Sequence, residues 1–308
     1  MDERIAKLIA NIEKVIVGKT EPITKIITAM LCEGHVLIED VPGVGKTQLV
    51  SALAKSVDGK FNRIQLTPDV MPSDIVGFSM VNQVTRELEY KEGAAMCNFL
   101  LADEINRASP KSQSSLLEVM EEHQISIDGN THILPRPFMT LATQNPVETY
   151  GTYHLPEAQM DRFIMKISIG YPSPEQELMI VSNSEAGITA AGVEAVMDTA
   201  DVVELIQKAG QIYVAPQVRE YAVSIVNATR NSPLIRLGVS PRGSIALIKA
   251  AKAFAFTLGR DYVTPDDVRY LAADCLAHRL ILSPKGKSQY PTNEQALEAV
   301  LMTVAAPQ

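Results

Sequence analysis

A glycine-containing loop at residues 43–48 has the residue types needed to hold a polyphosphate. An apolar run at 36–38 precedes the loop, and a helical pattern follows it. Two glycines allow several backbone N–H groups to point into one space, and the dipole of the following helix presents its positive end there. The lysine can reach the β and γ phosphates of ATP, and the threonine hydroxyl can bind Mg²⁺. We therefore predict a P-loop in which ATP and Mg²⁺ contact Gly43, Val44, Gly45, Lys46, Thr47 and Gln48.

One residue departs from the strict P-loop pattern. Asp40 stands six residues before Lys46, where the pattern has glycine. Aspartate tolerates turn conformations better than most residues, so we expect the loop to form. The alternative, an ordinary glycine turn that leads into a helix, is disfavoured by the order of strand, loop and helix.

Two adjacent acids follow the apolar run at 99–102. We expect this run to be a strand that delivers both carboxylates to the edge of a sheet. Asp103 would then hold Mg²⁺ through water, and Glu104 would polarise the attacking water as a general base. Strands that end in solvated acids are common, so the P-loop in the same chain is what favours catalysis here.

A third apolar run, at 138–142, leads to the amide of Asn145. An amide at the edge of the sheet can hydrogen-bond both the γ phosphate and the attacking water, so Asn145 is a candidate catalytic residue. The alternative for Asn145 and Pro146 is simple turn chemistry.

The elements expected to position these residues form two domains. Five short apolar runs, at 36–38, 63–66, 99–102, 138–142 and 164–167, alternate with helical stretches, which predicts an α/β core with a parallel five-stranded sheet. After Gly170 the pattern is helical, and prolines recur near the expected helix starts. We therefore predict an ATPase core at 1–170 and an all-α helical lid domain at 171–308.

Composition and charge narrow the range of partners and compartments. Of the 308 residues, 46% are hydrophobic and 21% are charged, and no run approaches the roughly 20 apolar residues that span a bilayer. The charged N-terminal segment lacks the features of a secretion signal, so we expect a cytoplasmic protein without membrane insertion. A net charge of −8 disfavours nucleic acid as a partner. The five histidines and three cysteines show no zinc-ligand spacing.

Taken together, five segments resemble the MoxR family of AAA+ ATPases. They are EDVPGVGKT (39–47), ADEINRA (102–108), ATQNP (142–146), LPEAQMDRF (155–163) and SPR (240–242). The resemblance implies ATP hydrolysis in a homo-oligomeric ring, usually a hexamer, that remodels or matures a protein substrate. It also implies a partner that carries a von Willebrand factor A domain.

The same resemblance implies roles for two arginines. Arg162 is similar to an arginine finger that reaches the γ phosphate of a neighbouring subunit, and Arg242 is similar to the second sensor of the lid. A cation in the first turn of a helix opposes the helix dipole, which supports an anion such as phosphate near Arg242. The alternative for Arg162 is a local ion pair with Asp161.

The resemblance also implies that two segments face the channel of the ring. One is the insertion at 66–93, and the other is a hairpin at 123–136 with a turn at Asp128, Gly129 and Asn130. The alternative for the hairpin is a plain surface loop.

Two other functions compete with a chaperone-like ATPase. One is a metal-chelatase or nucleic-acid motor subunit of the same wider group. The other is a nucleotide-gated assembly platform with little turnover, against which the intact pair of Asp103 and Glu104 argues.

Overall fold

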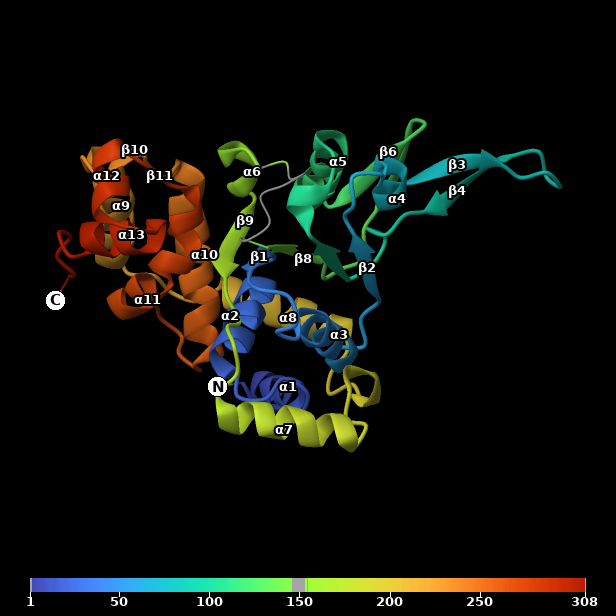
Figure 1. The fold of residues 1–308 in the computed structure, drawn as a ribbon, viewed down its shortest axis with the longest axis horizontal. Coiled ribbons are helices and arrows are strands. Elements are labelled where there is room, and N and C mark those ends of the chain that lie inside the picture. The colour runs from blue at the N-terminus through green and yellow to red at the C-terminus, as the bar shows by residue number, and fades with distance from the viewer. Residues whose placement is uncertain (1, 146–152, 154, 308) are drawn as a thin grey trace.

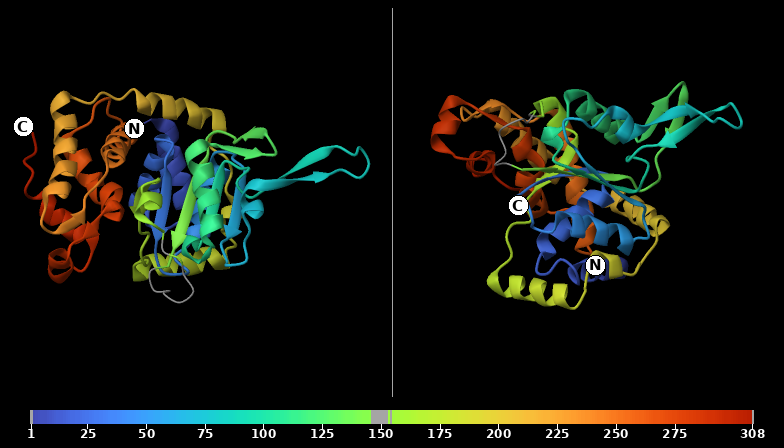
Figure 2. Two further views of the ribbon diagram at one scale, coloured as in Figure 1. Left: turned by 90° about the horizontal axis from the view of Figure 1, so that it is seen from above. Right: turned by 45° about the vertical axis from the view of Figure 1, so that its right-hand side comes forward.

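A parallel five-stranded sheet forms the centre of the molecule, as the sequence predicts (Figures 1 and 2). The computed structural model describes residues 2–145, 153 and 155–307. The strands stand in the order β2-β5-β8-β1-β9, and each neighbouring pair is parallel. Their bounds are His35–Glu39 (β1), Phe61–Gln65 (β2), Phe99–Asp103 (β5), Met139–Gln144 (β8) and Phe163–Ile167 (β9).

The middle strands are buried on both faces, which explains their nearly continuous apolar sequences. Val36 and Ile38 of β1 belong to the core cluster on one side of the sheet, and Leu37 belongs to the cluster on the other side. Helices α1 (Glu3–Glu13), α2 (Thr20–Leu31) and α3 (Lys46–Ser56) cover the first side, and α5 (Pro110–Glu122) covers the second (Figure 1). In β1 and β8 the only residues that are not buried, Glu39 and Gln144, lie at the carboxyl ends of the strands.

Two hairpins extend from the core at the side of β2 (Figure 1). One follows the short helix α4 (Pro72–Val76) and pairs β3 (Gly77–Val81) with β4 (Leu88–Glu92). The other pairs β6 (Gln124–Ile127) with β7 (Asn130–Ile133) and confirms the hairpin expected from the sequence. The rings of Tyr90 and His132 stack at 3.9 Å between centroids, so the two hairpins are in contact.

The C-terminal part is mostly helical, and it adds a short antiparallel pair, β10 (Ile235–Leu237) with β11 (Ile281–Leu282). The helices are α6 (Glu157–Met160), α7 (Pro174–Glu185), α8 (Thr199–Gly210), α9 (Pro216–Asn231), α10 (Pro241–Thr257), α11 (Pro265–Leu276), α12 (Pro284–Gln289) and α13 (Asn293–Leu301). Ser173 and Gln176 form a capping box at the start of α7, and prolines occupy the first turns of α9, α10 and α11. Helix α8 packs on α2 and α10, so the core continues across the proposed boundary at residue 170, which stays a prediction.

Within the described ranges, no helix has the length and apolar content required to cross a bilayer.

Candidate nucleotide site

The loop between β1 and α3 has the backbone geometry of a phosphate-binding loop. Gly43 and Gly45 have φ angles of 88° and 91°, a left-handed conformation that a side chain would strain. Lys46 opens α3, and its Nζ donates to the backbone oxygen of Asp40 at 2.7 Å. Burial lowers the pKa of Lys46, although the negative charges of nearby acids act to raise it. A partly desolvated ammonium at a helix N-terminus is well placed to bind an anion.

The carboxylate of Asp40 explains why this loop departs from the strict pattern. Its Oδ2 accepts hydrogen bonds from the backbone N–H groups of Ile169 (2.7 Å) and Gly170 (2.8 Å) and from the Ser168 hydroxyl (3.1 Å). Its Oδ1 accepts from the N–H of Val41 at 2.9 Å. Glycine has no side chain that could do this. Asp40 thus fastens the start of the P-loop to the segment that leaves β9.

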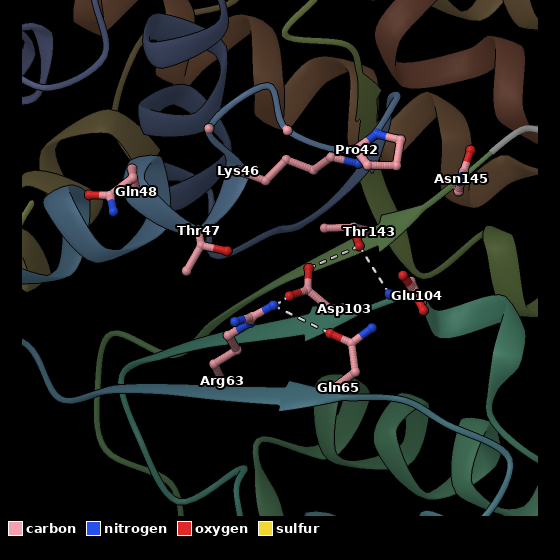
Figure 3. A pocket seen from close by; sticks show the side chains of 12 residues that line it. Pro42, Lys46, Thr47, Gln48, Arg63, Gln65, Asp103, Glu104, Thr143 and Asn145 are labelled. Atoms are coloured by element: carbon pink, nitrogen blue, oxygen red, sulfur yellow. Dashed lines mark hydrogen bonds and ion pairs between the residues drawn. The ribbon is translucent and has the colours of Figure 1, made fainter. Parts of the chain in front are cut away.

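A cavity of about 320 Å³ brings the P-loop together with the residues expected at the strand ends (Figure 3). Asn145 is buried, follows β8 directly and lines this cavity. The sequence-predicted residues that the cavity brings together are Gly43, Gly45, Lys46, Thr47, Gln48, Asp103, Glu104 and Asn145.

The two adjacent acids are held by a residue that the sequence did not single out. The Thr143 hydroxyl donates to Asp103 Oδ1 at 3.1 Å and accepts from the backbone N–H of Glu104 at 3.0 Å. Glu104 itself has a φ angle of 59°, which is strained for a residue with a side chain. Its Oε2 also accepts from Arg107 Nη1 at 2.8 Å. Thr143 therefore holds the Asp103 carboxylate and the Glu104 backbone, and Arg107 holds the Glu104 carboxylate.

Arg63 on β2 is a second residue that sequence reasoning missed. Its Nε donates to Asp103 Oδ2 at 2.6 Å, and its Nη2 donates to Gln65 Oε1 at 3.3 Å. The guanidinium therefore lies in the same cavity as Lys46 (Figure 3). Residues 63 and 65 lie on the same face of β2, and a neighbouring strand ends in acids. This pattern is the sequence signal that could have identified Arg63.

The donor set in this cavity fits Mg²⁺. Thr47 and Asp103 line the same space and offer a hydroxyl and a carboxylate, the hard oxygen ligands that Mg²⁺ prefers. Among the residues that the structure describes, no group of three or more His, Cys, Asp or Glu side chains is arranged to hold a metal ion. Mg²⁺ at nucleotide sites typically keeps several waters and binds mainly through phosphates.

A second cavity, of about 330 Å³, adjoins the first and is more apolar. Ile16, Val17, Val44, Tyr171 and Ile180 contribute to its lining. The two cavities share Pro42, Gly43, Gly45 and Gln48, so they form one elongated site with a polar and an apolar end.

The Gln48 side chain also has a partner outside the P-loop. Its Oε1 accepts from the backbone N–H of Ala190 at 3.0 Å. Gln48 lines both cavities, and its contact with nucleotide stays a prediction.

Arg162 and Arg242 do not line either part of this site. Arg162 Nε donates to Glu121 Oε2 and Arg242 Nη2 donates to Glu121 Oε1, each at 2.8 Å. Both arginines line a separate cavity. The anion expected near the first turn of α10 is thus a carboxylate of this chain, Glu121.

The alternative ion pair between Arg162 and Asp161 is wrong. The Asp161 carboxylate instead pairs with the buried Arg279 and accepts from the Ser240 hydroxyl at 2.9 Å. Arg279 also donates to the backbone oxygen of Phe163 at 2.7 Å. Because Arg279 and Ser240 come from the helical part, Asp161 is used to join that part to the core.

Fold and site together define an ATPase of the AAA class. Residues 35–165 match the model described as "ATPase family associated with various cellular activities (AAA)", and residues 227–300 match the AAA lid domain. Within that class the chain belongs to the MoxR family. Chaperone MoxR1 of Mycobacterium tuberculosis is 42% identical over 99% of this chain and 82% of its own length.

Two further relatives extend over nearly the whole chain. The uncharacterised protein YeaC of Bacillus subtilis is 48% identical over 98% of this chain and 95% of its own length. A crystal structure of a proposed ATPase from Cytophaga hutchinsonii has a TM-score of 0.91 and 38% identity, covering 99% of this chain and 95% of that one. The predicted fold class and the family resemblance are confirmed.

Proposed function

We propose that this chain hydrolyses ATP to ADP and phosphate in a homo-oligomeric ring and uses the energy to remodel or mature a partner protein. The observation that carries the proposal is the cavity in which Lys46, Thr47, Asp103, Glu104 and Asn145 converge. This set supplies a cation that binds the phosphates, oxygen ligands for Mg²⁺, a general base and an amide that positions the attacking water. Phosphoryl transfer to water requires these groups.

Each residue has a task set by its position. Gly43, Gly45 and Lys46 bind the phosphates, and Val44 contributes to the apolar end, which suits a planar base. Thr47 and Asp103 would hold Mg²⁺, which would neutralise part of the phosphate charge. Glu104 withdraws a proton from the attacking water, and Asn145 orients that water against the γ phosphate.

Arg162 and Arg242 act on the nucleotide of the neighbouring subunit. Their shared partner Glu121 and their separate cavity support this, because neither arginine lines the cavity that holds Lys46. The negative charge that develops on the γ phosphate is then stabilised by these two arginines only after the subunits assemble. An isolated subunit is accordingly expected to bind ATP and turn it over slowly.

The finer features of the assembly stay predictions. We propose a hexameric ring, with the insertion at 66–93 and the hairpin β6–β7 facing its channel. The exposed Phe78, Met80 and Val81 on the β3–β4 hairpin offer apolar contacts to a protein substrate. A von Willebrand factor A domain partner and a cytoplasmic location remain expectations from the sequence. MoxR1, a relative, is named a chaperone.

The variant Lys46→Ala tests the nucleotide assignment. It should lose ATP binding, because the long cation that reaches the β and γ phosphates is gone. Lys55→Ala, on the exposed side of the same helix, is the matched control and should bind ATP normally. Calorimetric titration of folded protein gives the answer, and normal ATP affinity in Lys46→Ala would refute the P-loop assignment. Phosphate release by the parent protein separates an ATPase from an assembly platform.

A further inference from the structure

Arg63 places a cation on the carboxylate that is proposed to serve Mg²⁺. Its Nε donates to Asp103 Oδ2 at 2.6 Å, while Asp103 Oδ1 is occupied by the Thr143 hydroxyl. In the register of the sheet, Gln65 lies directly opposite Asp103, and Arg63 approaches from the diagonal position on the same face. Both polar partners of Arg63 are therefore fixed by strands rather than by loops.

The position of the guanidinium matters more than the presence of an ion pair. Arg63 lines the same cavity as Lys46 and Thr47, and in Figure 3 it lies on the side of Asp103 that faces Thr47. The Asp103 side chain is nearly buried, and the Arg63 side chain is half exposed. A metal ion or its bound water that is shared by Thr47 and Asp103 would approach the same carboxylate oxygen.

We infer that Arg63 substitutes for Mg²⁺ at Asp103 when no metal is bound and so sets how strongly nucleotide binding depends on the metal. Without metal, the guanidinium neutralises Asp103 and reduces its repulsion of the incoming phosphates. A bound metal ion would need the same carboxylate oxygen, so the guanidinium and the metal compete for Asp103. Arg63 is thus a positioning residue, and this inference rests on the proposed nucleotide site.

A purely structural role for Arg63 predicts the opposite change in the ratio of the ATP affinities measured without and with Mg²⁺. If Arg63 only held Asp103 in the orientation that the metal needs, its removal would weaken binding of the Mg²⁺–ATP complex most. If Arg63 substitutes for the metal, its removal leaves Asp103 unneutralised toward metal-free ATP and removes a competitor of Mg²⁺. The ratio of the two ATP affinities therefore distinguishes these roles.

The experiment compares the dissociation constant of a non-hydrolysable, ribose-labelled ATP analogue in EDTA with that in saturating Mg²⁺. In Arg63→Gln the ratio of the EDTA value to the Mg²⁺ value should rise by about 3- to 10-fold, the range for loss of one partly exposed, charge-assisted pair. Arg63→Lys keeps the charge without the planar fork and should shift the ratio less.

The matched control is Lys60→Gln. Lys60 precedes the same strand, its side chain is 52% exposed against 50% for Arg63, and it pairs with Glu92 at 2.8 Å. The control ratio should equal the parent ratio. An unchanged or lower ratio in Arg63→Gln overturns the inference. If Arg63→Gln does not fold, the ratio measured for Arg63→Lys tests the inference in its place. Absence of ATP binding by the parent protein would instead contradict the proposed function.

Discussion

The carboxylate of Glu121 accepts a hydrogen bond from Arg162 Nε at 2.8 Å. Its other oxygen accepts from Arg242 Nη2 at the same distance, so one side chain of α5 holds one arginine from the core and one from the helical part. The pKa of Glu121 lies below its ordinary value, mainly because of the hydrogen bond from Arg162. The two arginines proposed to act in trans are thus aligned before assembly.

Replacing Glu121 by glutamine should loosen both arginines without affecting the P-loop. We expect ATP hydrolysis by the assembled protein to fall several-fold, roughly the effect of losing one or two partly exposed pairs, with ATP affinity unchanged. Glu122→Gln, at the next exposed position of α5, is the control and should behave like the parent. Steady-state phosphate release with a matched binding titration measures both quantities. Full turnover in Glu121→Gln would show that its carboxylate does not position the arginines.

Replacing Glu104 by glutamine should separate binding from hydrolysis. The amide keeps the shape of the side chain but cannot accept the proton of the attacking water, so turnover should fall by about 10²–10⁴-fold. ATP affinity should stay close to that of the parent protein. Single-turnover hydrolysis combined with equilibrium binding tests this. An unimpaired rate removes Glu104 from the role of base.

Replacing Asp40 by glycine, the residue of the strict P-loop pattern, should destabilise the protein. The N–H groups of Ile169 and Gly170 lose their acceptor, and each is at least partly buried, so we expect a loss of about 1–3 kcal/mol in the free energy of unfolding. Asp40→Asn keeps one carbonyl oxygen and should lose less. Urea denaturation followed by circular dichroism measures both variants. Equal stability of Asp40→Gly and the parent would mean that water replaces the carboxylate fully.

Acidification should destabilise the fold through His35. Its Nε2–H donates to the backbone oxygen of Met120, and its Nδ1 accepts from the N–H of Thr140. Burial is the main reason that the pKa of His35 is lowered to about 4. The unfolded chain, with a pKa near 6.5, therefore binds a proton first as the pH falls.

The contribution of His35 to stability is complete above about pH 6.5 and is lost as the pH falls toward 4, by up to about 1.4 kcal/mol per pH unit. Unfolding free energies measured from pH 7 to 4.5 should therefore fall, and His35→Gln should fall less steeply. Parallel slopes for the parent protein and His35→Gln would exclude this titration as a cause.

Local motifs explain why much of the fold and site was predictable. The apolar strands that precede Lys46, Asp103 and Asn145 carry the functional residues at their carboxyl ends, and parallel pairing brings those ends to one edge of the sheet. Glycines at 43 and 45 and the proline-containing helix starts encode backbone conformation directly.

The residues that were missed depend on contacts between distant parts of the chain. Arg63 and Asp103 are 40 residues apart, and Glu121 and Arg242 are 121 apart. A lone cation on β2 or an acid on α5 is indistinguishable in sequence from a solvated surface charge. The same holds for Asp161, whose sequence neighbour Arg162 was the obvious partner but whose actual partner is Arg279.

Mixing two inactive variants tests the central claim, an ATPase site completed by a neighbouring subunit. Lys46→Ala should bind no ATP, and Arg162→Ala should bind ATP but hydrolyse it about 10³-fold or more slowly. In mixed rings, an intact Lys46 cavity can meet an intact Arg162 from the next subunit. Phosphate release by the mixture, with mixed rings verified by two different affinity tags, should therefore exceed that of either variant alone. Inactive mixed rings, or parent-rate hydrolysis by Arg162→Ala alone, would contradict the shared site.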